Sequence, residues 1–143
     1  MGKTSFDGPV FGAKSLLWSA QADRAAGSTV AVTIGSITVP AGEDWLVTDL
    51  HVYRGSTHST ASVVTLTDDS TTVGDVAVTS SLAGVSGSTA VAKDADEYIG
   101  KRVATGSVLA LTVHDGGSSL ASSGWQAWVY GYPRWLQTST RGF

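Results

Sequence analysis

The chain has 143 residues, a net charge of −3, a charged fraction of 15% and no cysteine, so we expect one domain whose stability does not depend on disulfides. The weak negative charge, with no run of Lys or Arg, excludes nucleic acid as the main partner, because phosphate binding needs a concentrated basic surface. No stretch approaches the roughly 18 apolar residues of a membrane span, and the N-terminus lacks the apolar run of a signal peptide, so we expect neither membrane insertion nor export by a signal peptide.

The first 14 residues are expected to form an extended arm. They contain Gly and Pro at several places and show no sustained period. Phe6, Val10 and Phe11 provide apolar anchors, and Pro9 helps to keep the segment between them extended. Such an arm is suited to lie over the surface of another molecule.

The first half of the domain is predicted to consist of strands. Residues 15–20 open the first strand, although residues 19–26 have the Ala, Gln, Asp and Arg content of a short helix that ends at Gly27. We favour a strand followed by a loop. Residues 29–39 then alternate with period two and end at a Pro-Ala-Gly break, which predicts a second strand.

A further alternation over residues 45–54 divides the next predicted strand into two faces. One face carries Leu46, Leu50 and Val52, and the other carries Trp45, Val47, His51 and Tyr53. Later strands are predicted over residues 62–67, 73–79, 88–92 and 107–114, and an Asp-Asp-Ser turn at residues 68–70 ends the first of these.

The last strand, residues 124–132, carries aromatic side chains on both faces. Trp125, Ala127 and Val129 lie on one face, and Gln126, Trp128, Tyr130 and Tyr132 lie on the other. One face can enter the core, so the rings on the other face need a partner chain or a ligand to cover them. After Pro133 the alternation ends, and Trp135 is expected either to pack back as a lid or to lie on a neighbouring subunit.

These segments give eight short strands separated by Gly, Pro, Asp and Ser, with no convincing helix between them. This pattern predicts an all-β, antiparallel β-sandwich with jelly-roll or Greek-key topology. We divide the chain into an N-terminal arm (1–14), a β-sandwich domain (15–136) and a C-terminal tail (137–143).

The sequence offers no strong site for catalysis, a metal or a cofactor. Gly2-Lys3-Thr4 lacks the upstream glycine and the preceding strand of a phosphate loop, and the three histidines lack ligand spacing. Asp68-Asp69 with Asp75, or residues 94–97, are alternatives for a calcium ion, but neither has the spaced Asp-x-Asp-x-Asp-Gly loop, so solvated turns are favoured. We predict no enzyme activity, no metal and no cofactor.

Residues 4–12, Thr-Ser-Phe-Asp-Gly-Pro-Val-Phe-Gly, resemble the short arm at the start of small virion proteins of tailed bacteriophages. Residues 40–52, 106–111 and 128–133 look like strand segments of phage jelly-roll head-decoration and fibre-head domains. The resemblance implies a capsid decoration (cement) protein that is a homotrimer, lies on the capsid surface of the virion and is made in the host cytoplasm. Its arm would lie on the major capsid protein.

The first hypothesis is therefore a structural virion protein that stabilises a phage capsid. The second is a receptor- or carbohydrate-binding module of a phage fibre head, with aromatic rings that stack on the sugars of a surface glycan. A hydrolase is the third and weakest, because no pair of nucleophile and base is visible. The residues predicted to contact a partner are Phe6, Pro9, Val10, Phe11, Trp128, Tyr130, Tyr132 and Trp135.

Overall fold

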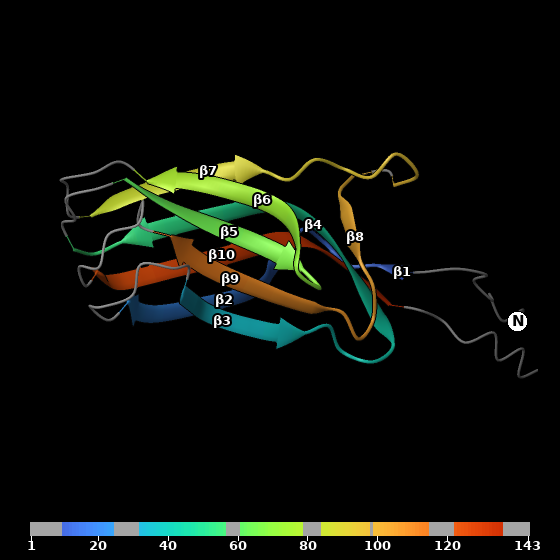
Figure 1. Ribbon diagram of the computed structural model, residues 1–143. Coiled ribbons are helices and arrows are strands. Elements are labelled where there is room, and N and C mark those ends of the chain that lie inside the picture. Colours follow the sequence, from blue (N-terminus) through green and yellow to red (C-terminus); the bar gives the residue numbers. More distant parts are fainter. Residues whose placement is uncertain are drawn as a thin grey trace, which may run out of the picture.

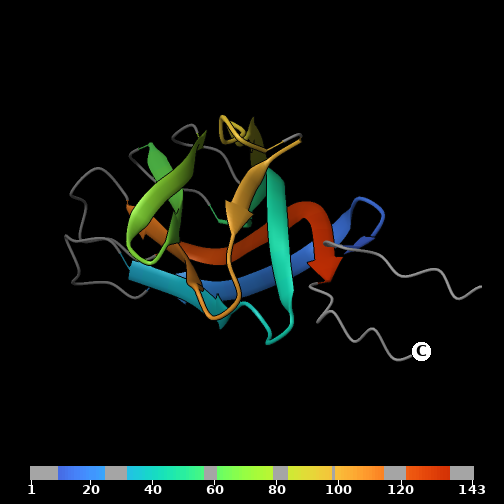
Figure 2. The same ribbon diagram turned by 90° about the vertical axis from the view of Figure 1, so that its right-hand side faces the viewer.

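The computed structural model describes residues 10–24, 32–56, 61–78, 84–97, 99–114 and 122–135. These residues form strands, turns and loops, and no helix occurs among them. Accordingly, the described part of the chain contains no helix long and apolar enough to cross a membrane. Two antiparallel sheets pack face to face as a sandwich, seen from the side in Figure 1 and along the strands in Figure 2.

The strands occur in the following order along the chain: β1 (Val10–Phe11), β2 (Ser15–Arg24), β3 (Val32–Thr38), β4 (Glu43–Arg54), β5 (Ser62–Asp68), β6 (Thr71–Val78), β7 (Val85–Ala90), β8 (Lys101–Val103), β9 (Val108–His114) and β10 (Ser122–Trp135). All eight predicted strands are present. The two additional strands, β1 and β8, have two and three residues, which is too short for an alternation to reveal them.

The strand order confirms the predicted jelly roll. The six-stranded sheet contains the run β2-β10-β4-β7. The short strand β1 pairs with β10 beyond the end of β2, and the short strand β8 pairs with β4 beyond the end of β7. The four-stranded sheet has the order β3-β9-β5-β6. This arrangement of two antiparallel sheets is that of a double Greek-key jelly roll. The alternative of a helix at residues 19–26 is wrong, because pairing with β10 keeps the chain extended to Arg24.

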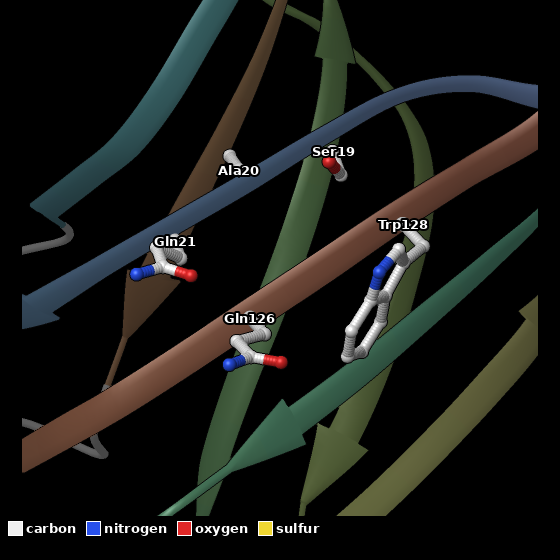
Figure 3. Close-up of a pocket in the computed structure, with 5 residues that line it drawn as sticks. All are labelled: Ser19, Ala20, Gln21, Gln126 and Trp128. Atoms are coloured by element: carbon white, nitrogen blue, oxygen red, sulfur yellow. The ribbon is translucent and has the colours of Figure 1, made fainter.

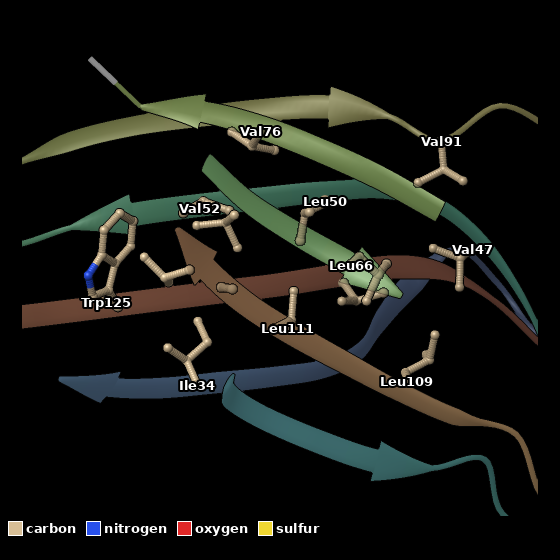
Figure 4. Close-up of a cluster of buried hydrophobic side chains, with 14 of the residues drawn as sticks. Ile34, Val47, Leu50, Val52, Leu66, Val76, Val91, Leu109, Leu111 and Trp125 are labelled. Carbon is tan, nitrogen blue, oxygen red and sulfur yellow. The ribbon is translucent and has the colours of Figure 1, made fainter. Parts of the chain in front are cut away.

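The core lies between the two sheets and is made almost entirely of aliphatic side chains (Figure 4). Trp125 is the largest fully buried side chain, and the guanidinium of buried Arg54 lies 5.7 Å from the centroid of its ring. The Arg54 Nη1 group also donates a hydrogen bond of 3.0 Å to the Ser62 hydroxyl. A buried cation that is both hydrogen-bonded and placed over an indole is compatible with a dry core.

A bulge in β4 corrects the predicted faces of residues 45–54. Tyr130 pairs with Asp49 but the next residue, Gly131, pairs with Val47, so Thr48 is an extra residue in β4. An extra residue reverses the direction of every side chain on one side of it. Trp45 and Val47 therefore join the core, while Leu46 is buried outside the core cluster. A period-two pattern cannot reveal such an insertion.

Gly131 lies where two bulges meet. In β2 the pairing passes from Trp18 opposite Val129 to Leu16 opposite Tyr130, so a residue is skipped there too. A Cβ atom on Gly131 would collide with the backbone carbonyl of Leu46. The absence of a side chain lets both neighbouring strands close around β10 at this point.

The two ends of the described chain lie side by side. Val10 pairs with Trp135 and Phe11 pairs with Arg134 in antiparallel register, and the Gly12 N–H donates a 2.7 Å hydrogen bond to the carbonyl of Pro133. The last residues of the predicted arm thus belong to the six-stranded sheet. Residues 1–9 of the arm, and residues 136–143 with the predicted tail, lie outside the described residues.

Candidate functional site

The outer face of β2-β10-β4-β7 carries its side chains in rows that cross the strands. The first row is Gln21, Gln126, Tyr53 and Ser86. The second row is Ser19, Trp128, His51 and Ser88. The third row is Leu16, Tyr130, Asp49 and Ala90. Residues opposite one another in an antiparallel pair point to the same face, so these twelve side chains form one surface.

Trp128 stands between two hollows of this surface. The first has a volume of about 190 Å³ and is lined by Ser19, Ala20, Gln21, Gln126 and Trp128. Figure 3 shows the amides of Gln21 and Gln126 next to each other, with the indole of Trp128 beside them. The second hollow has a volume of about 430 Å³ and is lined by His51, Val52, Ser86, Gly87, Ser88, Trp128 and Tyr130. Trp128 is the residue that the two linings share.

The chemical character of both hollows is neutral. Among the described residues that line them there is no Asp, Glu, Lys or Arg. Amides, hydroxyls and one imidazole provide hydrogen-bond donors and acceptors, and aromatic rings provide apolar contact. A third hollow of about 170 Å³ shares Gln21 and Gln126 with the first and contains Asp23, whose carboxylate accepts a 2.9 Å hydrogen bond from the Gly124 N–H.

An ion pair lies in the third row of the face, where Asp49 is opposite Tyr130. The Lys14 ammonium lies 2.6 Å from Asp49 Oδ2, which also accepts a hydrogen bond of 2.7 Å from the Thr48 hydroxyl. The hydrogen bond from Lys14 is the main reason that the pKa of Asp49 lies below its ordinary value, and the same bond raises the pKa of Lys14. Lys14 also lies in the loop after β1, so the pair joins this loop to the face.

A second cluster of charges lies at the end of the sheet near Trp135. Asp44 is 1% exposed. Its carboxylate accepts hydrogen bonds from Arg102 Nε at 2.8 Å and from Arg134 Nη2 at 3.0 Å. Arg134 also forms an ion pair with Glu97 at 3.2 Å. Burial raises the pKa of Asp44, but hydrogen bonds from both arginines and from the Thr105 N–H outweigh burial and hold the pKa below its ordinary value. The cluster joins β4, β8, β10 and the loop that contains Glu97.

Three of the carboxylates that were weighed as calcium ligands have local partners. Asp75 accepts a 2.6 Å hydrogen bond from the Thr65 hydroxyl, Asp69 accepts one of 2.9 Å from the Val108 N–H, and Asp94 pairs with Lys101 at 2.9 Å. Asp69 and Ser70 have positive φ angles of 44° and 73°, as the tight turn between β5 and β6 requires. No cluster of three or more potential metal ligands occurs among the described residues.

The structure separates the predicted contact residues into two groups. Trp128 and Tyr130 lie on the outer face and line the second hollow, and Tyr132 follows them one row further, opposite Leu46. Trp135 is 46% exposed, but it lies at the end of β10 beside the backbone of Val10 and Phe11. Phe6 and Pro9 lie outside the described residues.

Several polar residues of the face were not predicted from the sequence as binding residues. They are Ser19, Gln21, His51, Ser86, Ser88 and Gln126. Gln126 and His51 were placed on a strand face by alternation, but their neighbours come from β2 and β7, more than 30 residues distant along the chain. Only the register between strands brings them together, and no local pattern encodes that register.

Comparison with protein-family models and with curated proteins gives no match. Among solved structures, a carbohydrate-binding module described as "CBM36 in complex with calcium and xylotriose" aligns with 82% of this chain and 98% of its own. The sequence identity is 17% and the TM-score is 0.36.

Proposed function

We propose that this domain is a non-catalytic binding module that takes a saccharide on the outer face of β2-β10-β4-β7. The observation that carries the proposal is the position of Trp128, a half-buried indole between two hollows lined by amides and hydroxyls. The negative face of an aromatic ring attracts the C–H groups of a sugar ring, and amides or hydroxyls match sugar hydroxyls as both donors and acceptors. An apolar surface with a few convergent polar groups is typical of ligand sites.

The absence of carboxylates from the described lining supports a binding role rather than a catalytic one. Glycoside hydrolysis ordinarily needs two carboxyl groups on either side of the scissile bond. In the hollows, the nearest candidate base is His51, whose ring packs against Tyr130 with centroids 5.1 Å apart. The face has the chemistry to hold a sugar, and the described lining of the two hollows contains no carboxyl group to cleave it.

A glycan array with the wild-type protein and two variants tests this function. We expect a specific saccharide signal that Trp128→Ala abolishes and Trp135→Ala preserves, because Trp135 is an exposed tryptophan on the same strand but outside the hollows. Thermal unfolding of both variants checks that the loss does not come from misfolding. The absence of any glycan signal, or a signal that Trp128→Ala leaves unchanged, would contradict the proposed function.

A second candidate is a homotrimeric structural protein on the capsid surface of a phage virion, bound to the major capsid protein through the N-terminal arm. It is supported by the pairing of Val10, the first described residue, with Trp135, whose side chain is 46% exposed. Deletion of residues 1–9 leaves β1 and Lys14 in place. We expect this deletion to abolish co-sedimentation with capsids while size-exclusion chromatography with light scattering still reports a trimer. Unchanged co-sedimentation would exclude residues 1–9 as the anchor.

A further inference from the structure

We infer that the ligand of this face is a neutral oligosaccharide that crosses the strands, with one ring on Trp128 and further rings in the hollows on both sides. This inference rests on the proposed saccharide-binding function and specifies the charge, length and direction of the ligand. Three observations carry it: the positions of the hollows, the charges around them and the place of β10 and β4 inside the sheet.

The positions of the hollows define the direction. The first hollow lies over β2 and β10, because Gln21 and Gln126 line it, and the second lies over β4 and β7, because His51 and Ser88 line it. Four neighbouring strands span ~14 Å at ordinary sheet spacing. A single sugar on Trp128 reaches only one of the hollows. A short oligosaccharide at right angles to the strands reaches both.

The charges around the hollows exclude an acidic sugar. The described lining is neutral, and the carboxylates of Asp23 and Asp49 lie at its borders. Lys14, a cation at the border of this face, lies 2.6 Å from Asp49 and forms an ion pair with it. A uronate or a sialic acid would therefore meet negative charge without a compensating partner in the hollows, in a protein whose net charge is already −3.

The place of the hollows inside the sheet favours a saccharide over a peptide. A peptide that joins a sheet needs a free strand edge for its backbone hydrogen bonds. β10 has β2 on one side and β4 on the other, and β4 has β10 and β7, so the two strands that carry Trp128 and His51 offer no free edge. Recognition has to come from side chains, and the paired amides of Gln21 and Gln126 can bind neighbouring hydroxyls through both their oxygen and their nitrogen.

Calorimetry with a length series tests the inference on the protein as it is. The probes are the mono- to hexasaccharides of the strongest neutral hit from the glycan array, and an acidic oligosaccharide of equal length is the comparison. We expect affinity to rise at least about tenfold from the monosaccharide to the trisaccharide, with one added contact surface per ring, and then to level off. The acidic oligosaccharide should bind at least about tenfold more weakly than the neutral one.

Two variants on opposite sides of Trp128 test the direction. Gln21→Ala removes an amide from the first hollow, and Ser88→Ala removes a hydroxyl from the second. Each should lower the affinity for the trisaccharide about 3- to 10-fold and leave the affinity for the monosaccharide within about twofold, because one hydrogen bond contributes modestly. Thr112→Ala, on the outer side of the other sheet, is the control and should change neither.

The outcomes separate the inference from the proposed function. Full affinity for the monosaccharide, a preference for the acidic oligosaccharide, or a loss from only one of the two variants would overturn the inference while Trp128-dependent saccharide binding still stood. A protein that binds no saccharide, or binds one without Trp128, would overturn both. Trp128→Phe keeps an aromatic ring and should retain part of the affinity, which separates loss of stacking from loss of folding.

Discussion

The imidazole of His51 and the ring of Tyr130 meet edge to face, with centroids 5.1 Å apart and planes inclined at 78°. The two residues come from neighbouring strands, β4 and β10, and both line the larger hollow. An edge-to-face pair is the arrangement that the quadrupole of an aromatic ring prefers. The contact therefore fixes the wall of the hollow against which a ligand on Trp128 would lie.

A double-mutant cycle with His51→Ala and Tyr130→Ala should give a coupling energy of about 0.5 kcal/mol, at the low end for ring pairs because His51 is exposed. Urea unfolding of the four proteins measures it. We expect Tyr130→Ala to lower saccharide affinity more than His51→Ala, because the tyrosine has the larger ring. Additive effects on stability would show that the two rings do not support each other.

Replacement of Asp44 by Ala should lower the free energy of unfolding by about 3–5 kcal/mol. The substitution removes the Asp44 carboxylate from Arg134, which is only 10% exposed, and from Arg102. Chemical denaturation measures the loss. Asp96→Ala, at an exposed residue of the same region, serves as the control and should stay within about 0.5 kcal/mol. Equal effects of the two substitutions would show that the buried carboxylate of Asp44 stabilises the fold no more than an exposed one does.

Stability should fall in acid through the carboxylates with depressed pKa. Hydrogen bonds from Lys14 and Lys101 lower the pKa values of Asp49 and Asp94, and the pKa of Asp44 is also lowered. Their contribution is complete above the ordinary carboxyl pKa of about 3.9 and is lost as the pH falls through the lower folded-state values. Urea midpoints measured from pH 7 downward should drop below about pH 4, and less steeply in Asp44→Asn. Parallel profiles would contradict this assignment.

Asp68 should behave with the opposite sign. Burial and the neighbouring charge of Asp69 raise its pKa, and its Oδ1 atom is buried with no hydrogen-bond partner among the described residues. The charged form therefore lowers the free energy of unfolding at neutral pH, and this destabilisation disappears as the pH falls through the raised pKa. Asp68→Asn should raise the free energy of unfolding at pH 7 by up to about 1 kcal/mol. A lower urea midpoint for the variant would show that the carboxylate is needed.

Gly131→Ala should destabilise the protein strongly, by about 3 kcal/mol or more, because the added Cβ atom meets the backbone carbonyl of Leu46 and side-chain repacking cannot relieve that contact. Gly74→Ala is the matched control in β6, where the nearest atoms are methyl groups at 3.5 Å. It should change stability by less than about 1 kcal/mol. Thermal unfolding of both variants compares them, and a tolerated alanine at residue 131 would mean that β2 and β4 can separate from β10 there.

The sequence predicted the faces of β10 because this strand keeps its alternation from Trp125 to Tyr132. Trp125, Ala127 and Val129 are fully buried, as expected from period two. The faces of residues 45–47 were wrong because the extra residue in β4, Thr48, reverses the alternation there, and bulges leave no simple mark in a pattern of apolar residues.

The candidate site was only half visible in the sequence. Trp128 and Tyr130 could be assigned to one face of one strand. The amide of Gln21 and the hydroxyls of Ser86 and Ser88 reach the same face through the pairing of β2 with β10 and of β4 with β7. These pairings depend on contacts across the whole jelly roll, so single-strand periodicity cannot supply them.

A titration followed by NMR tests the central claim most directly. The five tryptophans provide five indole N–H resonances, and the titrant is the neutral trisaccharide of the length series. We predict saturable shifts at the indole of Trp128 and at the side-chain amides of Gln21 and Gln126, with the indoles of buried Trp45 and Trp125 nearly unmoved. Shifts confined to Trp135, or no shift at millimolar trisaccharide, would contradict the account.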